Sequence, residues 1–331
     1  MRLSWDCPRS VWTSVLSHSP SATFFHSPEW ADVVAANGLG QPRPLLAQWA
    51  DGRQALCVLG IRPVWGGLVR AARSGTAGGH GGIVANGPLS DSERRLFFRS
   101  LWRRFPECGG STNPFGEPLP AGTGFMATPA SPTLAVRLAP LAELRRHYHR
   151  ERLRAVERYQ QQGVEMRVIP QPGPADWRAF CRLYEQEVEH WRELGRPMHL
   201  VRDAHWFQSL QSLAAKQLRL VAASVAGELA GMLVYAGQHR VVTEFYMVWD
   251  RRFSQHQIST ALKEACLVES HAHGYDYVDF MPSGGLTGVE HFKTSFGAEP
   301  LAISEFYHPS WPTRGLKALR PERRLATPQA S

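Results

Sequence analysis

The spacing of apolar residues along this chain switches between a period of two and a period of three to four, and each stretch predicts an element. Asp203 is placed as a helix N-cap, and Gly163 and Gly274 each end a helix. The elements expected after residue 132 are, in order, a strand at 134–138, a helix at 142–162, a strand at 164–169, helices around 177–191 and 203–213, strands at 218–225, 229–236 and 240–248, a helix at 258–273, a strand at 275–280, a short helix around Lys293 and a strand near 300–307.

The first half carries clear helix signals. Ser27 as N-cap and Pro28 at the first helical position predict a helix that stops at Asn37-Gly38. A glycine-rich segment follows at 75–88, and because it has no Gly-Lys-Ser/Thr, it is not a phosphate-binding P-loop. The pattern of 91–105 then predicts a basic amphipathic helix.

One hairpin pattern occurs twice. Strands at 45–49 and 54–61 flank Asp51-Gly52, which is a strong turn signal. Residues 45–55 share four identities with residues 220–230, which lie 175 positions later. The repeat indicates an internal duplication of one supersecondary unit.

Length and composition favour two domains. A chain of 331 residues with 43% hydrophobic content is long for a single core. Residues 106–132 are crowded with Pro and Gly and are typical of a connection that contains one short strand. We therefore expect an α/β protein with mixed sheets, a first domain at 1–132, a second domain at 133–308 and a basic tail at 309–331.

The net charge of +8 suits a polyanionic partner such as RNA, a phosphorylated ligand or a membrane surface, and composition does not choose among them. The five cysteines are odd in number and contain no CxxC pair, which favours reduced thiols in a cytoplasmic protein. No window approaches the roughly 20 apolar residues of a membrane span. We expect no membrane span.

Lys293 stands out because the chain has 33 Arg and only four Lys. It lies between Phe292 and Phe296, whose spacing of four predicts a shared buried face that directs the lysine away from them. A compact ammonium there could meet a phosphate or a developing oxyanion. A solvated lysine on an amphipathic helix is the alternative.

The order of elements after residue 132 is the layout of the Gcn5-related N-acyltransferase (GNAT) fold, and the repeated hairpin suggests two copies. In members that use acyl-CoA, a loop with the pattern [Gln/Arg]-x-x-Gly-x-[Gly/Ala] closes on the pyrophosphate at a helix N-terminus. Here that place is held by 252–257, Arg-Phe-Ser-Gln-His-Gln, and both glycines are missing. A coenzyme A site of the usual kind is therefore disfavoured, and no cofactor is expected.

A double GNAT-like chain with Phe-Lys-x-x-Phe-Gly at 292–297 resembles the Fem-type (FemABX) aminoacyl-tRNA-dependent transferases. The segments 24–30, 163–164 and 275–280 add to the resemblance, which spans residues 24–307. It implies a tandem GNAT-like fold, an aminoacyl-tRNA donor, and an amine acceptor such as a peptidoglycan precursor or a natural product. It also implies a catalytic role for Lys293.

Several charged residues are candidates for binding the donor or a phosphate. Arg146, Arg150, Arg154 and Arg158 recur every four residues on the helix expected at 142–162 and would form a basic ridge. A solvated helix face balanced by acidic neighbours is equally compatible with this spacing. Arg251 and Arg252 follow the third strand of the meander and, with the ridge, would meet the tRNA or a phosphorylated acceptor.

The carboxylates nearest the lysine in sequence are Glu244, Asp279 and Glu290, and any of them could assist proton removal. His147 with His149 and His271 with His273 are each two residues apart, so on a helix neither pair can chelate a metal. We expect no metal site.

The leading hypothesis is an N-acyltransferase that forms an amide by direct transfer from aminoacyl-tRNA, with Lys293, Asp279 and Glu244 as catalytic candidates. Arg251, Arg252, Arg150, Arg154, Phe292 and Phe296 are the candidates for binding the donor or a phosphate. One rival is a GNAT-like enzyme that uses acyl-CoA or an acyl carrier. Another is an inactive scaffold that binds RNA or phosphate.

Overall fold

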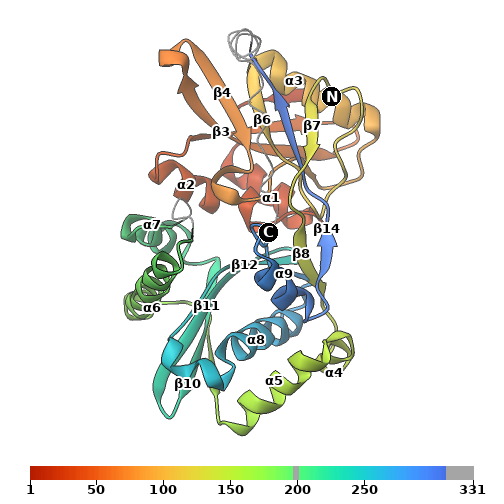
Figure 1. Ribbon diagram of the computed structural model, residues 1–331. Coiled ribbons are helices and arrows are strands. Elements are labelled where there is room, and N and C mark those ends of the chain that lie inside the picture. Colours follow the sequence, from red (N-terminus) through yellow and green to blue (C-terminus); the bar gives the residue numbers. More distant parts are fainter. Residues whose placement is uncertain (197–200, 311–331) are drawn as a thin grey trace, which may run out of the picture.

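The computed structural model describes residues 1–196 and 201–310, and these fold around two mixed β-sheets (Figure 1). The strands of the first sheet are β1 (Arg2–Ser4), β2 (Gln41–Gln48), β3 (Gln54–Val64), β4 (Val69–Ser74), β5 (Val84–Ala85), β6 (Glu107–Ser111), β7 (Met126–Pro129) and β15 (Ser304–His308). Those of the second are β8 (Thr133–Arg137), β9 (Glu165–Ile169), β10 (Leu218–Val225), β11 (Glu228–Gln238), β12 (Val241–Trp249), β13 (Tyr277–Asp279) and β14 (Glu299–Leu301).

Helices cover the faces of both sheets. They are α1 (Arg9–His18), α2 (Pro28–Ala36), α3 (Asp91–Arg104), α4 (Leu141–Leu144), α5 (Arg150–Gln161), α6 (Pro174–Glu193), α7 (Ala204–Ala214), α8 (Ile258–Ala272) and α9 (Thr287–Thr294). No helix among the described residues is both long enough and apolar enough to cross a membrane. The expected α/β class with mixed sheets is confirmed.

The two sheets have the same plan. The first runs β1-β2-β3-β4-β6-β15-β7, and the second, read from its other edge, runs β9-β10-β11-β12-β13-β8-β14. Among the described strands, each sheet contains one parallel pair, β4 with β6 and β12 with β13, at the same place in the order. The repeated hairpin is β2–β3 in the first sheet and β10–β11 in the second, as the sequence predicts.

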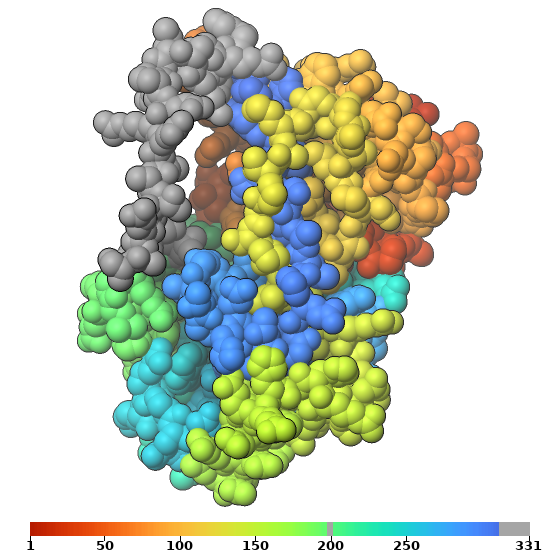
Figure 2. All heavy atoms as spheres, turned by 45° about the vertical axis from the view of Figure 1, so that its right-hand side comes forward, coloured from red at the N-terminus to blue at the C-terminus, as the bar shows by residue number. Residues whose placement is uncertain are grey.

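The chain returns to the first sheet at its last described strand, β15. β7 and β8 are consecutive in the chain but lie in different sheets. The same is true of β14 and β15. β15 pairs with β6 and β7 of the first sheet, and β8 pairs with β13 and β14 of the second. Figure 2 shows the two connecting segments, coloured yellow and blue, running side by side from the upper to the lower body. The strand expected near 300–307 is thus two strands, one in each sheet.

An aromatic core joins the two domains. Phe24 and Trp30, at α2 and just before it, pack in one apolar cluster with side chains of α6, α7 and the second sheet. The ring of Phe24 lies 5.3 Å from that of Phe245, and Trp30 lies 5.7 Å from Trp206. A large apolar interface of this kind opposes free motion between domains.

The helix expected at 142–162 is the main error in the predicted elements. The chain forms α4, a 3₁₀ turn at Arg145–His147, and then α5 after an extended Tyr148. The ring of Tyr148 is buried 5.2 Å from that of Phe296, and the His149 N–H donates to the carbonyl of Ser295. These contacts with the chain after α9 outweigh the local helical pattern.

Other elements were missed or lie outside the described part. Sequence spacing gave no sign of α1 or β4, and it predicts one strand in 106–132 where β6 and β7 are both present. The basic tail lies outside the described residues from 311 onward. The boundary at residue 132 stays a prediction.

Candidate active site

A pocket of about 470 Å³ opens in the second domain where the parallel pair separates. The pairing of β12 with β13 ends at Thr243 and Asp279, and beyond it β12 continues to Trp249 while the other strand turns away through 280–282. We call this cavity the lysine pocket. It is lined by Glu187, Trp191, Arg196, Glu244, Phe245, Met247, Trp249, Ser259, Lys263, Phe280, Met281, Pro282, Gly288, Val289, Phe292 and Lys293.

Lys293 lies in the last turn of α9, with only 8% of its surface exposed. Its Nζ donates to the carbonyl oxygens of Met281, at 2.8 Å, and Pro282, at 3.1 Å. Since an ammonium has three N–H donors, one is left for a ligand in the pocket. Burial, together with the nearby Lys263, lowers the pKa of Lys293 to about 8.

The backbone that holds Lys293 is strained. Met281 has a φ of 64°, a conformation that side chains other than glycine rarely adopt. Its N–H donates to the Asp279 carboxylate at 2.8 Å, and its carbonyl accepts from Lys293. Asp279 and Lys293 therefore hold the two peptide groups that flank Met281, at the wall of the pocket.

Asp279 also connects the domains. Its second oxygen lies 2.6 Å from Nε2 of His80, which comes from the glycine-rich segment of the first domain, and the hydroxyl of Thr133 donates to its first oxygen. All three side chains are buried. Asp279 does not line the lysine pocket among the described residues, so its contacts are those of a positioning residue.

A second lysine lies in the same pocket. Lys263 of α8 is 1% exposed, and its Nζ donates to both oxygens of Glu244, at 2.8 and 2.6 Å. The Nζ also lies 3.6 Å from the centre of the Phe280 ring. Sequence reasoning missed Lys263, although the scarcity of lysine that singles out Lys293 applies equally to it.

Arg251 lies beside the pocket and Arg252 does not line it. The Arg251 guanidinium donates to both oxygens of the buried Glu187 and stacks over Trp249, and Glu187 also accepts from the indole of Trp191. Arg252 is exposed and pairs with Asp250 and Glu228.

The two phenylalanines beside Lys293 differ in position. Phe292 lines the pocket, whereas Phe296 is fully buried beyond the end of α9, with the two rings 5.3 Å apart. The buried Arg152 stacks over both, at 4.5 and 4.8 Å, and donates to Ser295 and Thr260. This guanidinium, which the sequence did not single out, holds α9 against α5 and α8.

The proposed basic ridge is shorter than expected. Arg146 lies in the 3₁₀ turn, so only Arg150, Arg154 and Arg158 share α5, where all three are exposed. None of the four is among the lining residues of the lysine pocket. A role for Arg150 and Arg154 in binding the donor stays a prediction about the outer surface.

The loop that would face a pyrophosphate is a 3₁₀ turn at Arg251–His256, and it leads through Gln257, with a φ of 57°, into α8. The α8 N-terminus has no side-chain cap, but the loop has no glycine that would let backbone N–H groups close on a phosphate.

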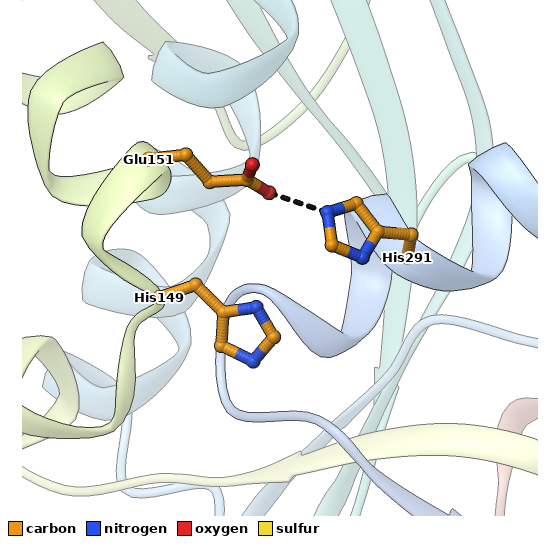
Figure 3. Close-up of side chains that lie close together, drawn as sticks. All are labelled: His149, Glu151 and His291. Atoms are coloured by element: carbon orange, nitrogen blue, oxygen red, sulfur yellow. Dashed lines mark hydrogen bonds and ion pairs between the residues drawn. The ribbon is translucent and has the colours of Figure 1, made fainter.

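The only side chains in the described residues grouped so that they could hold a metal ion are His149, Glu151 and His291 (Figure 3). Their possible ligand atoms lie within 4.8 Å of one another, and His291 Nε2 is 2.6 Å from the Glu151 carboxylate. All three are exposed, and none lines the lysine pocket. The prediction that His147 and His149 point to opposite sides of one helix does not apply, because the two residues are not on one helix.

A second pocket, of about 630 Å³, lies beside the corresponding parallel pair of the first sheet. We call it the glycine pocket because Gly75, Gly78 and Gly79 line it, together with the side chains of Arg62, Arg73 and Arg202. A side chain at Gly75 would not fit, since its Cβ would lie 2.2 Å from the Ser111 hydroxyl. Pro282 lines both pockets, so they adjoin at the loop that Lys293 holds.

Comparisons with known proteins agree with this architecture. Residues 144–294 match the family model described as an acetyltransferase (GNAT) domain. The structure of FemX superposes with a TM-score of 0.75 at 10% identity, covering 96% of this chain and 99% of that one. The chain has a Fem-type double GNAT fold. No curated protein matches it by sequence.

Two further structures share this double GNAT fold. A conserved protein of unknown function from Bacteroides thetaiotaomicron has a TM-score of 0.61 at 12% identity, covering 93% of this chain and 99% of that one. L-PGS from Bacillus licheniformis has a TM-score of 0.51 at 15% identity, covering 87% of this chain and 90% of that one. The fold resemblance to Fem-type proteins that the sequence motif predicts is therefore confirmed, and the fold is that of GNAT acyltransferases.

Proposed function

We propose that this protein transfers an aminoacyl group from aminoacyl-tRNA to an amine and forms an amide bond. The observation that carries the proposal is the Lys293 ammonium, buried at the wall of a pocket between separating strands with one N–H left for a ligand. The similarity in fold to FemX supports an aminoacyl donor, and the absence of glycines in 252–257 argues against acyl-CoA.

In the proposed reaction the ester end of the donor enters the lysine pocket and the acceptor amine approaches from the glycine pocket, past Pro282. The amine nitrogen attacks the ester carbonyl and gives a tetrahedral oxyanion, which Lys293 stabilises. The C–O bond to the tRNA ribose then breaks, the ribose oxygen gains a proton, and the amine nitrogen loses one.

Two of the three candidate bases, Glu244 and Asp279, are occupied by hydrogen bonds, and the third, Glu290, is exposed and does not line the lysine pocket. Glu244 accepts from Lys263, and Asp279 accepts from His80, Thr133 and Met281. We therefore assign them to positioning and to the charge balance of the site. The acceptor would enter as the free amine.

The proposal is tested by incubating the protein with labelled aminoacyl-tRNA and a mixture of amines, with and without ribonuclease. We expect a ribonuclease-sensitive amide product. Lys293→Met should remove it, whereas Lys216→Met, which changes an exposed lysine, should not. Product formation that ribonuclease leaves unchanged would exclude tRNA as the donor.

The match of residues 144–294 to an acetyltransferase domain favours a second candidate, transfer from acyl-CoA or an acyl carrier. Acyl-CoA offered in place of aminoacyl-tRNA distinguishes the two donors. Salt-dependent RNA binding without turnover of either donor would instead favour the third alternative, an inactive scaffold that binds RNA or phosphate.

A further inference from the structure

The β3–β4 hairpin extends beyond the first sheet. The last pairing of β3 with β2 is at Ile61, and the first pairing of β4 with β6 is at Ala71. Residues 63–70 therefore pair only with each other, and in Figure 1 this end of the hairpin projects from the top of the first domain. At about 3.4 Å per residue, the tip reaches roughly 13 Å past the neighbouring strands.

The tip of this hairpin is apolar and exposed. Leu68 has 89% of its surface exposed and Trp65 has 41%, and neither belongs to an apolar cluster of the described residues. The backbone of Trp65 has a φ of 56°, a conformation that costs free energy for a residue with a bulky side chain. Exposed tryptophan and leucine at the end of a two-stranded ribbon contribute little to the stability of the fold. Such exposed apolar side chains are typical of a binding surface.

The flanks of the hairpin are basic. Segment 60–74 contains three arginines and no acidic residue. The strand register places Arg62 and Arg73 on one face of the ribbon and Arg70 on the other, and all three are exposed. Arg73 lies 3.7 Å from Glu305, while Arg62 and Arg70 stand about 7–10 Å behind the tip on either side.

We propose that the β3–β4 hairpin docks the protein onto an anionic lipid surface. Trp65 and Leu68 enter the region between headgroups and acyl chains, where tryptophan is favoured, and Arg62 and Arg70 meet anionic headgroups. The reach of the ribbon matches the roughly 5–10 Å depth of such insertion. Because Arg62 and Arg73 also line the glycine pocket, docking brings the mouth of that pocket close to the lipid headgroups.

Sedimentation of the full chain with vesicles tests this proposal. Vesicles of phosphatidylcholine alone are compared with vesicles in which about a third of the lipid is phosphatidylglycerol. We expect binding to the anionic vesicles that salt weakens. The double variant Trp65→Ser/Leu68→Ser should bind them at least about tenfold more weakly, and Arg70→Gln should have a smaller effect.

A matched control is Leu96→Ser/Leu213→Ser, which removes two exposed leucines from α3 and α7 and should leave vesicle binding unchanged. Thermal unfolding of the tip variant should match the parent, because the tip lies outside the cores. The proposal is overturned if the parent does not bind anionic vesicles or if the tip variant binds them equally well. Loss of tRNA binding or of self-association in the tip variant, with vesicle binding intact, would overturn it too.

Discussion

Each of the two pockets lies beside the parallel strand pair of its own sheet, yet the two are built from different side chains. The lysine pocket has two buried lysines, a carboxylate that pairs with one of them, and aromatic walls. The glycine pocket has arginines and a glycine-rich loop, and none of its described lining residues is lysine. A buried ammonium can lose its proton near neutral pH, whereas a guanidinium keeps its charge. The difference teaches that the repeated scaffold supplies a cavity in each sheet and that its side chains differ in kind. Under the proposed function, the lysine pocket is where the reaction occurs and the glycine pocket is where the acceptor binds.

The largest expected effect on either pocket is the loss of stability when the ion pair of the lysine pocket is disrupted. Lys263→Met leaves Glu244 buried without its partner and should cost about 3–5 kcal/mol of unfolding free energy. Adding Glu244→Leu removes the orphaned charge and should recover most of that loss. Denaturant unfolding of both variants measures the loss and its recovery. Equal stability of the single and double variants would mean that Lys263 and Glu244 are not energetically coupled.

The next largest effect separates reaction from binding. Lys293→Met should lower kcat about 10²–10³-fold, because the developing oxyanion loses its donor. Arg73→Met, in the glycine pocket, should chiefly raise KM for an anionic acceptor. In the parent, the rate should fall as pH rises through about 8, where the Lys293 ammonium deprotonates, and the residual activity of Lys293→Arg should lack that fall. A kcat loss in Arg73→Met equal to that in Lys293→Met would reverse the two assignments.

The same lysine should reduce stability. Its pKa is about 8 in the folded protein, against 10.5 for an ordinary lysine, so the unfolded chain binds more protons between these values. Stability that depends on Lys293 therefore rises with pH between about 8 and 10.5. Lys293→Met should be more stable than the parent by up to about 3 kcal/mol at pH 7, and the advantage should shrink toward pH 10.5.

Unfolding of the two proteins across this pH range checks the sign. A constant difference between them would show that Lys293 has the same pKa in both states.

The smallest expected effect concerns the backbone strain in the two loops that line the pockets. The glycine pocket uses Gly75 at a φ of 75°, whereas the lysine pocket forces Met281 to 64°. Met281→Gly should relieve that strain and raise stability by about 1 kcal/mol, while it loosens the carbonyl that holds Lys293 and lowers kcat. Calorimetry and turnover assays test both parts. A destabilised variant would show that the methionine side chain contributes more packing than its backbone costs.

Local patterns predicted the parts of the fold that depend on neighbouring residues. Ser27 caps α2 through the N–H of Trp30, and α8 begins at Ile258 and ends within a residue of its expected limit. The helix at 142–162 was wrong because Tyr148 packs against Phe296, nearly 150 residues later. Such a contact leaves no trace in local spacing.

The site was predicted in the same uneven way. Lys293 could be found from the sequence because lysine is scarce in this chain and because it lies in the Phe-Lys-x-x-Phe-Gly motif, and it does line the lysine pocket. Lys263, Glu187 and His80 come from three other segments, and only the tertiary structure brings them close. Lysine scarcity would have found the first of these, whereas no local signal distinguishes the buried Glu187 from other acids on an amphipathic helix.

The pairing of β15 with the first sheet has a consequence for dividing this molecule into fragments. A fragment ending near residue 132 would lack the strand between β6 and β7, and the complementary fragment would carry β15 with no sheet to join. Each piece would therefore expose unpaired backbone edges and be prone to aggregate. We therefore expect the two halves to unfold together, because both the pairing of β15 and the aromatic contact fix how far apart their two pockets lie.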